Sequence, residues 1–78
     1  MPTVLYLKGY RFFFFSNEGC EPIHIHVEKA DCYSKFWIDP LFVAANYRFN
    51  SKELREISFI IEENENLIKE KWNEYFNK

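Results

Sequence analysis

Two neighbouring segments of the chain alternate between apolar and polar residues, and this pattern constrains the fold more than any other. Residues 23–29 alternate with a period of two, which is typical of a β-strand that turns one face toward a hydrophobic core. The aliphatic positions are Ile23, Ile25 and Val27, and the polar positions are His24, His26 and Glu28. The pattern therefore predicts a half-buried strand with both histidines on its second face.

Residues 33–39 predict the antiparallel partner of this strand, because Ala30 and Asp31 can form a two-residue turn between them. The predicted pairs are Lys29 with Cys32, Glu28 with Tyr33, His26 with Lys35, Ile25 with Phe36, His24 with Trp37 and Ile23 with Ile38. One face then carries Ile23, Ile25, Val27, Phe36 and Ile38, and the other carries His24, His26, Lys35 and Trp37. A register slip of one residue would mix the two sets. Such a slip is unfavourable, because it would move aliphatic residues out of the buried face.

The N-terminal residues predict a second hairpin. Residues 3–7 and 10–16 are rich in aromatic and β-branched residues, and Lys8 and Gly9 form a candidate turn between them. The predicted pairs are Leu7 with Tyr10, Tyr6 with Arg11, Leu5 with Phe12, Val4 with Phe13 and Thr3 with Phe14. Both faces of this hairpin are apolar, so we expect it to lie centrally in the sheet or to be covered on both sides. The aromatic residues 12–15 are expected in the core, and residues 16–22 in a polar loop.

The C-terminal third predicts a helix. Asn50 and Glu53 have the spacing of a capping box. An apolar stripe with spacings of three and four follows, at Leu54, Ile57, Ile61, Ile68, Trp72 and Tyr75, with Asn64 as the one interruption. A continuous helix to residue 77 would be about 40 Å long at about 1.5 Å per residue, so it either breaks near Asn64 or overhangs the sheet. Residues 41–47, which follow Pro40, are ambiguous, and we favour a short edge strand over a helical turn.

These elements together predict an α+β fold. An antiparallel β-meander of three to five strands, at about residues 3–47, carries a C-terminal helical segment, at about residues 51–77, packed on one face. A chain of 78 residues has room for one core, so we expect a single domain over residues 1–78. Hydrophobic residues make up 47% of the chain and charged residues 28%, which excludes a disordered chain.

Charge and cysteine content narrow the classes of function. The formal net charge of -2 gives no bulk attraction to nucleic acid or acidic membranes. No apolar run approaches about 18 residues, and there is no leader pattern, so we expect a cytoplasmic protein without a membrane partner. Cys20 and Cys32 flank a predicted strand and should lie about 20 Å apart at about 3.3 Å per residue. Because a disulfide requires Cα atoms within about 7 Å, we expect two free thiols, which fit a reducing compartment.

Several short motifs resemble a small bacterial family, domain of unknown function 4160. They lie at residues 1–3, 9–14, 16–18, 21–22, 24–27, 35–37, 46–47, 51–54 and 72, and the most specific is Pro-x-His-x-His-Val at residues 22–27. The resemblance covers essentially the whole chain. It implies a gene that lies beside the gene of another small protein, in pairs that have been proposed as toxin–antitoxin modules. Ala30 and Arg48 depart from the pattern, since the family often has Gly at these positions.

The two histidines allow a metal hypothesis. His24 and His26 lie on one strand face with Cα atoms about 6.5 to 7 Å apart, so they could share a divalent metal. Zinc sites usually have at least three protein ligands, and only Glu28 on the same face could add a third. A divalent metal is therefore a possible cofactor, although the ligand set is incomplete and we expect none.

A second hypothesis is RNA binding or cleavage. His24 and His26 would act as acid and base, and Lys35 or Arg11 would stabilise the charge that develops on the phosphate. Tyr33 or Trp37 would stack on a base. The acidic net charge argues against this hypothesis, because the few cations would have to form a local patch.

The third hypothesis, which we favour, is a protein-interaction module. Interfaces are enriched in aromatic residues and arginine, and the chain offers Arg11, Tyr33, Trp37 and Trp72 as contact residues. The partner would be a protein encoded nearby or a second copy of the chain. Trp72, Tyr75 and Phe76 would form a docking end if the helix extends past its own sheet.

Overall fold

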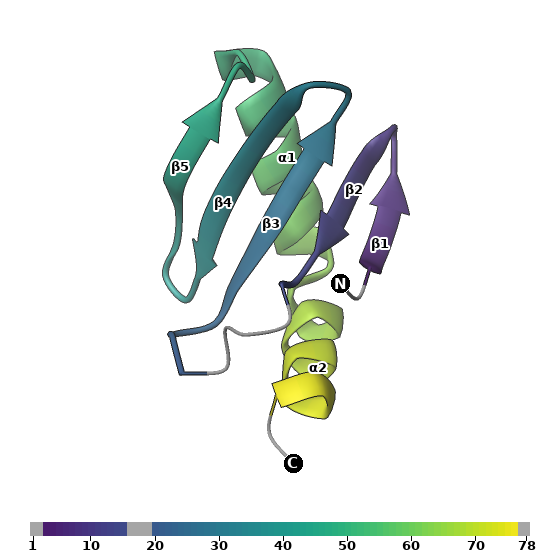
Figure 1. Ribbon diagram of the computed structural model, residues 1–78, viewed down its shortest axis with the longest axis vertical. Coiled ribbons are helices and arrows are strands. Elements are labelled where there is room, and N and C mark those ends of the chain that lie inside the picture. Colours follow the sequence, from purple (N-terminus) through teal and green to yellow (C-terminus); the bar gives the residue numbers. More distant parts are fainter. Residues whose placement is uncertain (1–2, 16–19, 77–78) are drawn as a thin grey trace.

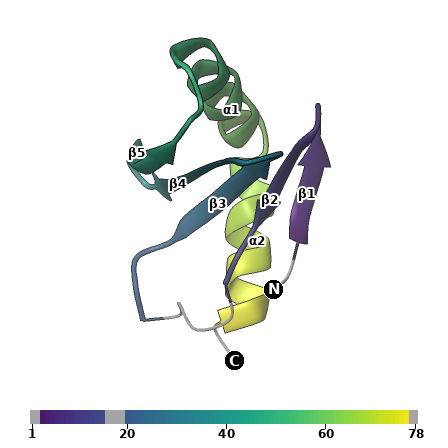
Figure 2. The same cartoon turned by 45° about the horizontal axis from the view of Figure 1, so that its top comes forward.

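The computed structural model describes residues 3–15 and 20–76, so the predicted loop at residues 16–19 and the end of the predicted helix at residue 77 lie outside the described residues. The strands are β1 (Thr3–Leu7), β2 (Tyr10–Phe13), β3 (His24–Lys29), β4 (Cys32–Ile38) and β5 (Leu41–Tyr47), and the helices are α1 (Ser51–Glu63) and α2 (Glu65–Phe76). The strands form one sheet in the order β1-β2-β3-β4-β5 with antiparallel neighbours. Both helices lie on the same side of it, and α2 extends past one end (Figures 1 and 2). The predicted α+β meander is confirmed.

The central hairpin of β3 and β4 has the predicted register. All pairs from Lys29 with Cys32 to His24 with Trp37 are observed, and the amide of Ile38 donates to the carbonyl of Ile23 at 3.2 Å. The apolar face of this hairpin is in the core, which α1 covers. The core comprises Tyr10, Phe12, Phe14, Ile25, Val27, Phe36, Ile38, Phe49, Ile57, Ile60, Ile61, Ile68 and Trp72.

The N-terminal hairpin is partly as predicted. Pairing next to the turn is confirmed, but Thr3 lies opposite Phe13 and not Phe14, because the register shifts between Thr3 and Leu5. The expectation that the whole hairpin lies centrally was wrong for β1, which forms one edge of the sheet and leaves Tyr6 exposed. It holds for β2, which is an inner strand with both faces buried.

The chain after Pro40 forms strand β5, as favoured from the sequence, and β5 is the second edge of the sheet. Its pairing with β4 shifts between Lys35 and Phe36, which leaves Ala44 as an extra residue in β5. Such bulges twist an edge strand and interrupt its row of hydrogen-bonding groups. Continued strand pairing at this edge is therefore disfavoured.

The helical segment begins and breaks where the sequence predicted. The side chain of Asn50 accepts from the amide of Glu53 at 2.8 Å, and the Glu53 carboxylate accepts from the amide of Asn50 at 3.1 Å. The first helix, α1, ends at Glu63 and is capped by Asn64, whose side-chain amide donates to the carbonyl of Ile60 at 2.9 Å. The second helix, α2, starts at Glu65. The break lets Ile68 and Trp72 of α2 join the core beyond the end of α1.

Candidate functional site

The face of the sheet away from α1, here called the open face, carries most of the predicted site residues. Neighbours directly opposite in a sheet share a face, so the strand registers place its members across four strands. They are Arg11 and Phe13 of β2, His24, His26 and Glu28 of β3, Tyr33, Lys35 and Trp37 of β4, and Phe42, Ala45 and Tyr47 of β5. The open face is toward the viewer in Figure 1. The sequence therefore predicted correctly that the histidines share a face with Lys35 and Trp37.

Both histidines are nevertheless buried, with 0% of His24 and 2% of His26 exposed. Nδ1 of His24 donates to the carbonyl of Pro22 at 2.9 Å, which fixes the tautomer of a neutral ring. Nδ1 of His26 shares a hydrogen bond of 2.6 Å with the hydroxyl of Tyr33. One nitrogen of each ring is thus engaged within the chain itself.

Aromatic rings enclose the histidine pair. The ring centroid of His26 is 4.4 Å from that of Phe15 and 5.5 Å from that of Phe13. The ring centroid of His24 is 5.4 Å from that of Trp37 and 5.1 Å from that of Trp72 of α2. The two imidazoles are 5.0 Å apart. A substrate could reach either imidazole only if these rings moved, so the pair forms an inner layer of the site and not its surface.

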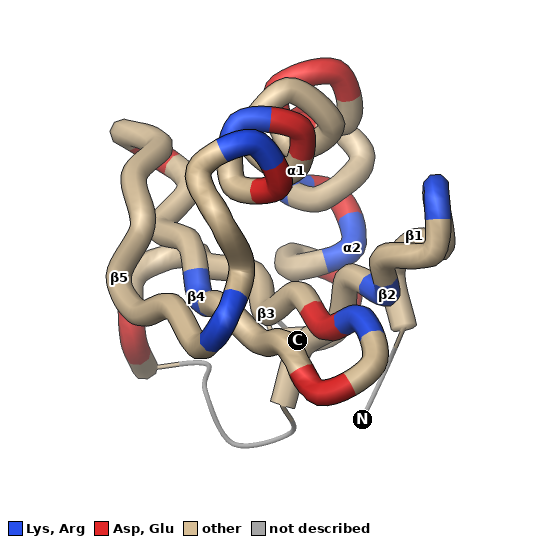
Figure 3. The backbone as a smooth tube through the Cα atoms, turned by 90° about the horizontal axis from the view of Figure 1, so that it is seen from above, with Lys and Arg blue, Asp and Glu red and all other residues tan. Residues whose placement is uncertain are grey.

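The cations at this face are paired with carboxylates. Arg11 donates to Glu28 at 2.9 Å. Lys35 donates to Glu21 at 3.2 Å, and its ammonium group lies 4.5 Å from the centre of the Trp37 ring. Where β5 ends, Arg48 donates to Asp31 of the β3–β4 turn at 2.7 Å. Basic and acidic positions are correspondingly interspersed along the backbone in Figure 3. The positive charge of each of these three side chains is therefore largely offset by a nearby carboxylate.

Two exposed aromatic side chains lie on the open face, both from β5. Phe42 lies opposite Trp37 and Tyr47 lies opposite Tyr33 on β4 and β5, and these four residues are here called the aromatic face. Phe42 is 53% exposed and Tyr47 is 71% exposed. Neither residue was predicted from the sequence as part of the site. The signal that could have found them is the register of β5 on β4, which was unknown while residues 41–47 remained ambiguous.

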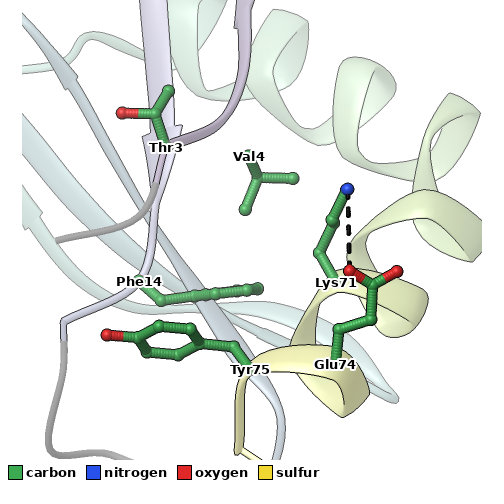
Figure 4. Close-up of a pocket in the computed structure, with 6 residues that line it drawn as sticks. All are labelled: Thr3, Val4, Phe14, Lys71, Glu74 and Tyr75. Carbon is green, nitrogen blue, oxygen red and sulfur yellow. Dashed lines mark ion pairs between the residues drawn. The ribbon is translucent and has the colours of Figure 1, made fainter.

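The predicted docking end of α2 is largely packed within the fold. Trp72 is buried, with ring centroids 5.2 Å from Phe14 and 4.3 Å from Phe76. Tyr75 is the most exposed of the three C-terminal aromatic residues. It lines a cavity between β1 and α2, together with Thr3, Val4, Phe14, Lys71 and Glu74 (Figure 4). Lys71 and Glu74 lie 3.8 Å apart across one side of this cavity, so the charges that line it neutralise each other.

The metal hypothesis gains no third ligand. Among residues 3–15 and 20–76, no group of three or more His, Cys, Asp and Glu side chains is arranged to hold a metal ion. Glu28, the third ligand considered from the sequence, binds Arg11 instead. Cys20 and Cys32 are free, as predicted.

A family model described as Domain of unknown function (DUF4160) matches residues 9–73. The chain belongs to this family. Searches of curated proteins and of solved structures found no match. Within the described part of this DUF4160 chain, neither helix is long and apolar enough to span a membrane.

Two non-glycine residues named in the sequence analysis, Ala30 and Arg48, have an unusual backbone conformation. Ala30 has a φ of 55° and Arg48 a φ of 74°, both in the left-handed region. Glycine adopts this region without the steric cost that a Cβ atom causes. The DUF4160 chain therefore holds two non-glycine residues in a conformation that glycine adopts more readily.

Proposed function

We propose that this DUF4160 chain is a protein-interaction module, one component of a two-gene pair, and that it binds its protein partner through the aromatic face. The observation that carries the proposal is the exposure of Phe42 and Tyr47 beside Trp37 and Tyr33 on the open face. Aromatic residues are enriched at interfaces because they bury large areas and lose little side-chain freedom. The family resemblance suggests the partner, which is the small protein encoded next to this chain.

The charge distribution favours a protein over RNA as the partner. Nucleic-acid sites need cations that can neutralise phosphates, and Arg11, Lys35 and Arg48 are each within 3.2 Å of a carboxylate. An aromatic centre with a rim of paired charges matches the usual anatomy of a protein interface. The burial of His24 and His26 also separates the proposed acid–base pair from any bound RNA.

The proposal is tested by titrating the purified chain with the purified product of the neighbouring gene in a calorimeter. The double variant Phe42→Ser/Tyr47→Ser should bind at least about tenfold more weakly, since aromatic contacts at the centre of an interface commonly contribute that much. Phe59→Ser is the matched control, because Phe59 is 61% exposed on α1, which lies on the other side of the sheet. Circular dichroism of all variants checks that the fold is retained.

Three results would contradict the proposal. They are equal affinity of the double variant and the parent chain, an equal loss in Phe59→Ser, and no binding of the neighbouring protein at all. A parallel titration with single-stranded RNA completes the test. Tight RNA binding that is lost in the double variant would show that the aromatic face binds RNA and not a protein.

A further inference from the structure

A pocket at one end of the aromatic face indicates what the partner presents to it. The pocket has a volume of about 270 Å³ and is lined by Pro22, Ile23, Trp37, Asp39, Pro40 and Phe42. Trp37 and Phe42 also belong to the aromatic face, so the pocket and this face form one continuous surface. The inference drawn from it rests on the proposed function.

Asp39 is the one charged residue among those that line the pocket, and its side chain is 71% exposed. Lys69 of α2 lies 3.7 Å from its carboxylate but only 2.9 Å from that of Glu65. The Lys69 ammonium group is thus held mainly within α2. The Asp39 carboxylate keeps a longer ion pair with Lys69 and, being largely exposed, can accept from a second cation that enters the pocket.

The aromatic walls also suit a cation. The face of an indole or phenyl ring attracts ammonium and guanidinium groups. The structure contains such a contact on the same ring, since the Lys35 ammonium group lies 4.5 Å from the centre of Trp37. Arg and Lys side chains have long aliphatic stems that pack on apolar surfaces, and Pro22, Pro40 and Phe42 provide such a surface.

We infer that this pocket receives a basic side chain, arginine or lysine, from the protein partner. The aliphatic stem lies along the proline rings and Phe42, and the cationic head lies between the Trp37 ring and the Asp39 carboxylate. An uncharged aliphatic side chain would fill the same space but would leave the carboxylate without a partner from the bound protein. The formal net charge of -2 on this chain adds a weak attraction for a basic partner.

The inference is tested by NMR titration of the full chain with N-acetyl-arginine methylamide, which stands for the partner's basic side chain. The indole N–H resonance of Trp37 should shift, and N-acetyl-norleucine methylamide should shift it much less. Asp39→Asn should weaken binding of the arginine probe about three- to tenfold, in line with a single charge-assisted contact. Asp31→Asn is the matched control, since the Asp31 side chain is 72% exposed and pairs with Arg48 away from the pocket.

Equal shifts from both probes, no shift from either, or unchanged binding by Asp39→Asn would overturn the inference. A titration of Asp39→Asn with the neighbouring protein separates this result from the proposed function. If Phe42→Ser/Tyr47→Ser loses partner binding while Asp39→Asn keeps full affinity, the proposed function stands and the inference fails. If the arginine probe binds in an Asp39-dependent way but the neighbouring protein does not bind, the pocket chemistry stands and the proposed partner is wrong.

Discussion

His26→Ala should destabilise the fold strongly, because His26 is a packed residue beneath the aromatic face. The substitution removes a ring that is 2% exposed, packs against Phe13 and Phe15, and hydrogen-bonds to Tyr33 at 2.6 Å. Loss of a large buried side chain usually costs about 2 to 5 kcal/mol, including the cavity that remains. The hydrogen bond adds about 1 kcal/mol, but an imidazole gains less from burial than a phenyl ring. We therefore expect a loss of about 2 to 4 kcal/mol in the free energy of unfolding.

This loss is large for a chain of 78 residues, whose total stability should be about 4 to 12 kcal/mol at about 0.05 to 0.15 kcal/mol per residue. Urea denaturation followed by circular dichroism measures it. Glu28→Gln is the control on the same strand and face, because the Glu28 side chain is 45% exposed and an amide oxygen can still accept from Arg11. If His26→Ala costs less than about 1 kcal/mol but abolishes an activity on RNA, the histidine is catalytic and the structural assignment is wrong.

Three further predictions concern the core, the turns and the dependence of stability on pH. Ile25→Ala should lower the free energy of unfolding in urea by about 2 to 4 kcal/mol, and Ile23→Ala should lower it less, because Ile25 is fully buried and Ile23 only partly. A loss below about 0.5 kcal/mol for Ile25→Ala would refute the core assignment. Ala30→Gly should stabilise the chain by about 0.5 to 1 kcal/mol, since it relieves a left-handed alanine, and a lowered melting temperature would refute this. Burial and the hydrogen bond to Glu56 raise the pKa of Tyr10 to about 12 from an ordinary value of 10.0. Between about pH 10 and pH 12 the folded chain therefore keeps a proton that the unfolded chain releases, so the stability from Tyr10 is present below about pH 10 and is lost over this range. Tyr10→Phe should flatten the decline of the unfolding free energy between these pH values, and an unchanged slope would contradict the account.

The central hairpin could be predicted from the sequence because two independent constraints agree there. The turn at Ala30 and Asp31 fixes which residues pair, and the alternation of aliphatic residues fixes which face is buried. A slip of register would have placed Ile25 and Phe36 on the open face. The capping box at Asn50 and the helix break at Asn64 were predictable for a similar reason, since both depend on side chains that bond to the nearby backbone.

The burial of the histidines could not be predicted from these local patterns. The alternation of residues along β3 places His26 on the open face. Its exposure, however, depends on Phe15, which lies beyond the end of β2 and contacts the imidazole. The burial of His24 depends on Trp72, which is 48 residues away in the sequence and reaches His24 only because the helix breaks at Asn64. Long-range contacts of this kind leave no periodic signal in the chain.

The aromatic face was missed for a related reason. Phe42 and Tyr47 join Trp37 and Tyr33 only through the register of β5 on β4. A bulge at Ala44 shifts that register, so even a correct strand prediction would not have placed both residues on the open face. The bulge thus determines which side chains the edge strand presents to a partner.

Mapping the interface by hydrogen exchange, with and without the neighbouring protein, tests the central claim most directly. The account predicts that the partner slows exchange in the amides of β4 and β5, around Trp37, Phe42 and Tyr47, and leaves exchange in α1 around Phe59 unchanged. Slower exchange confined to α1, or to the end of α2 around Tyr75, would contradict the claim that the aromatic face is the binding surface.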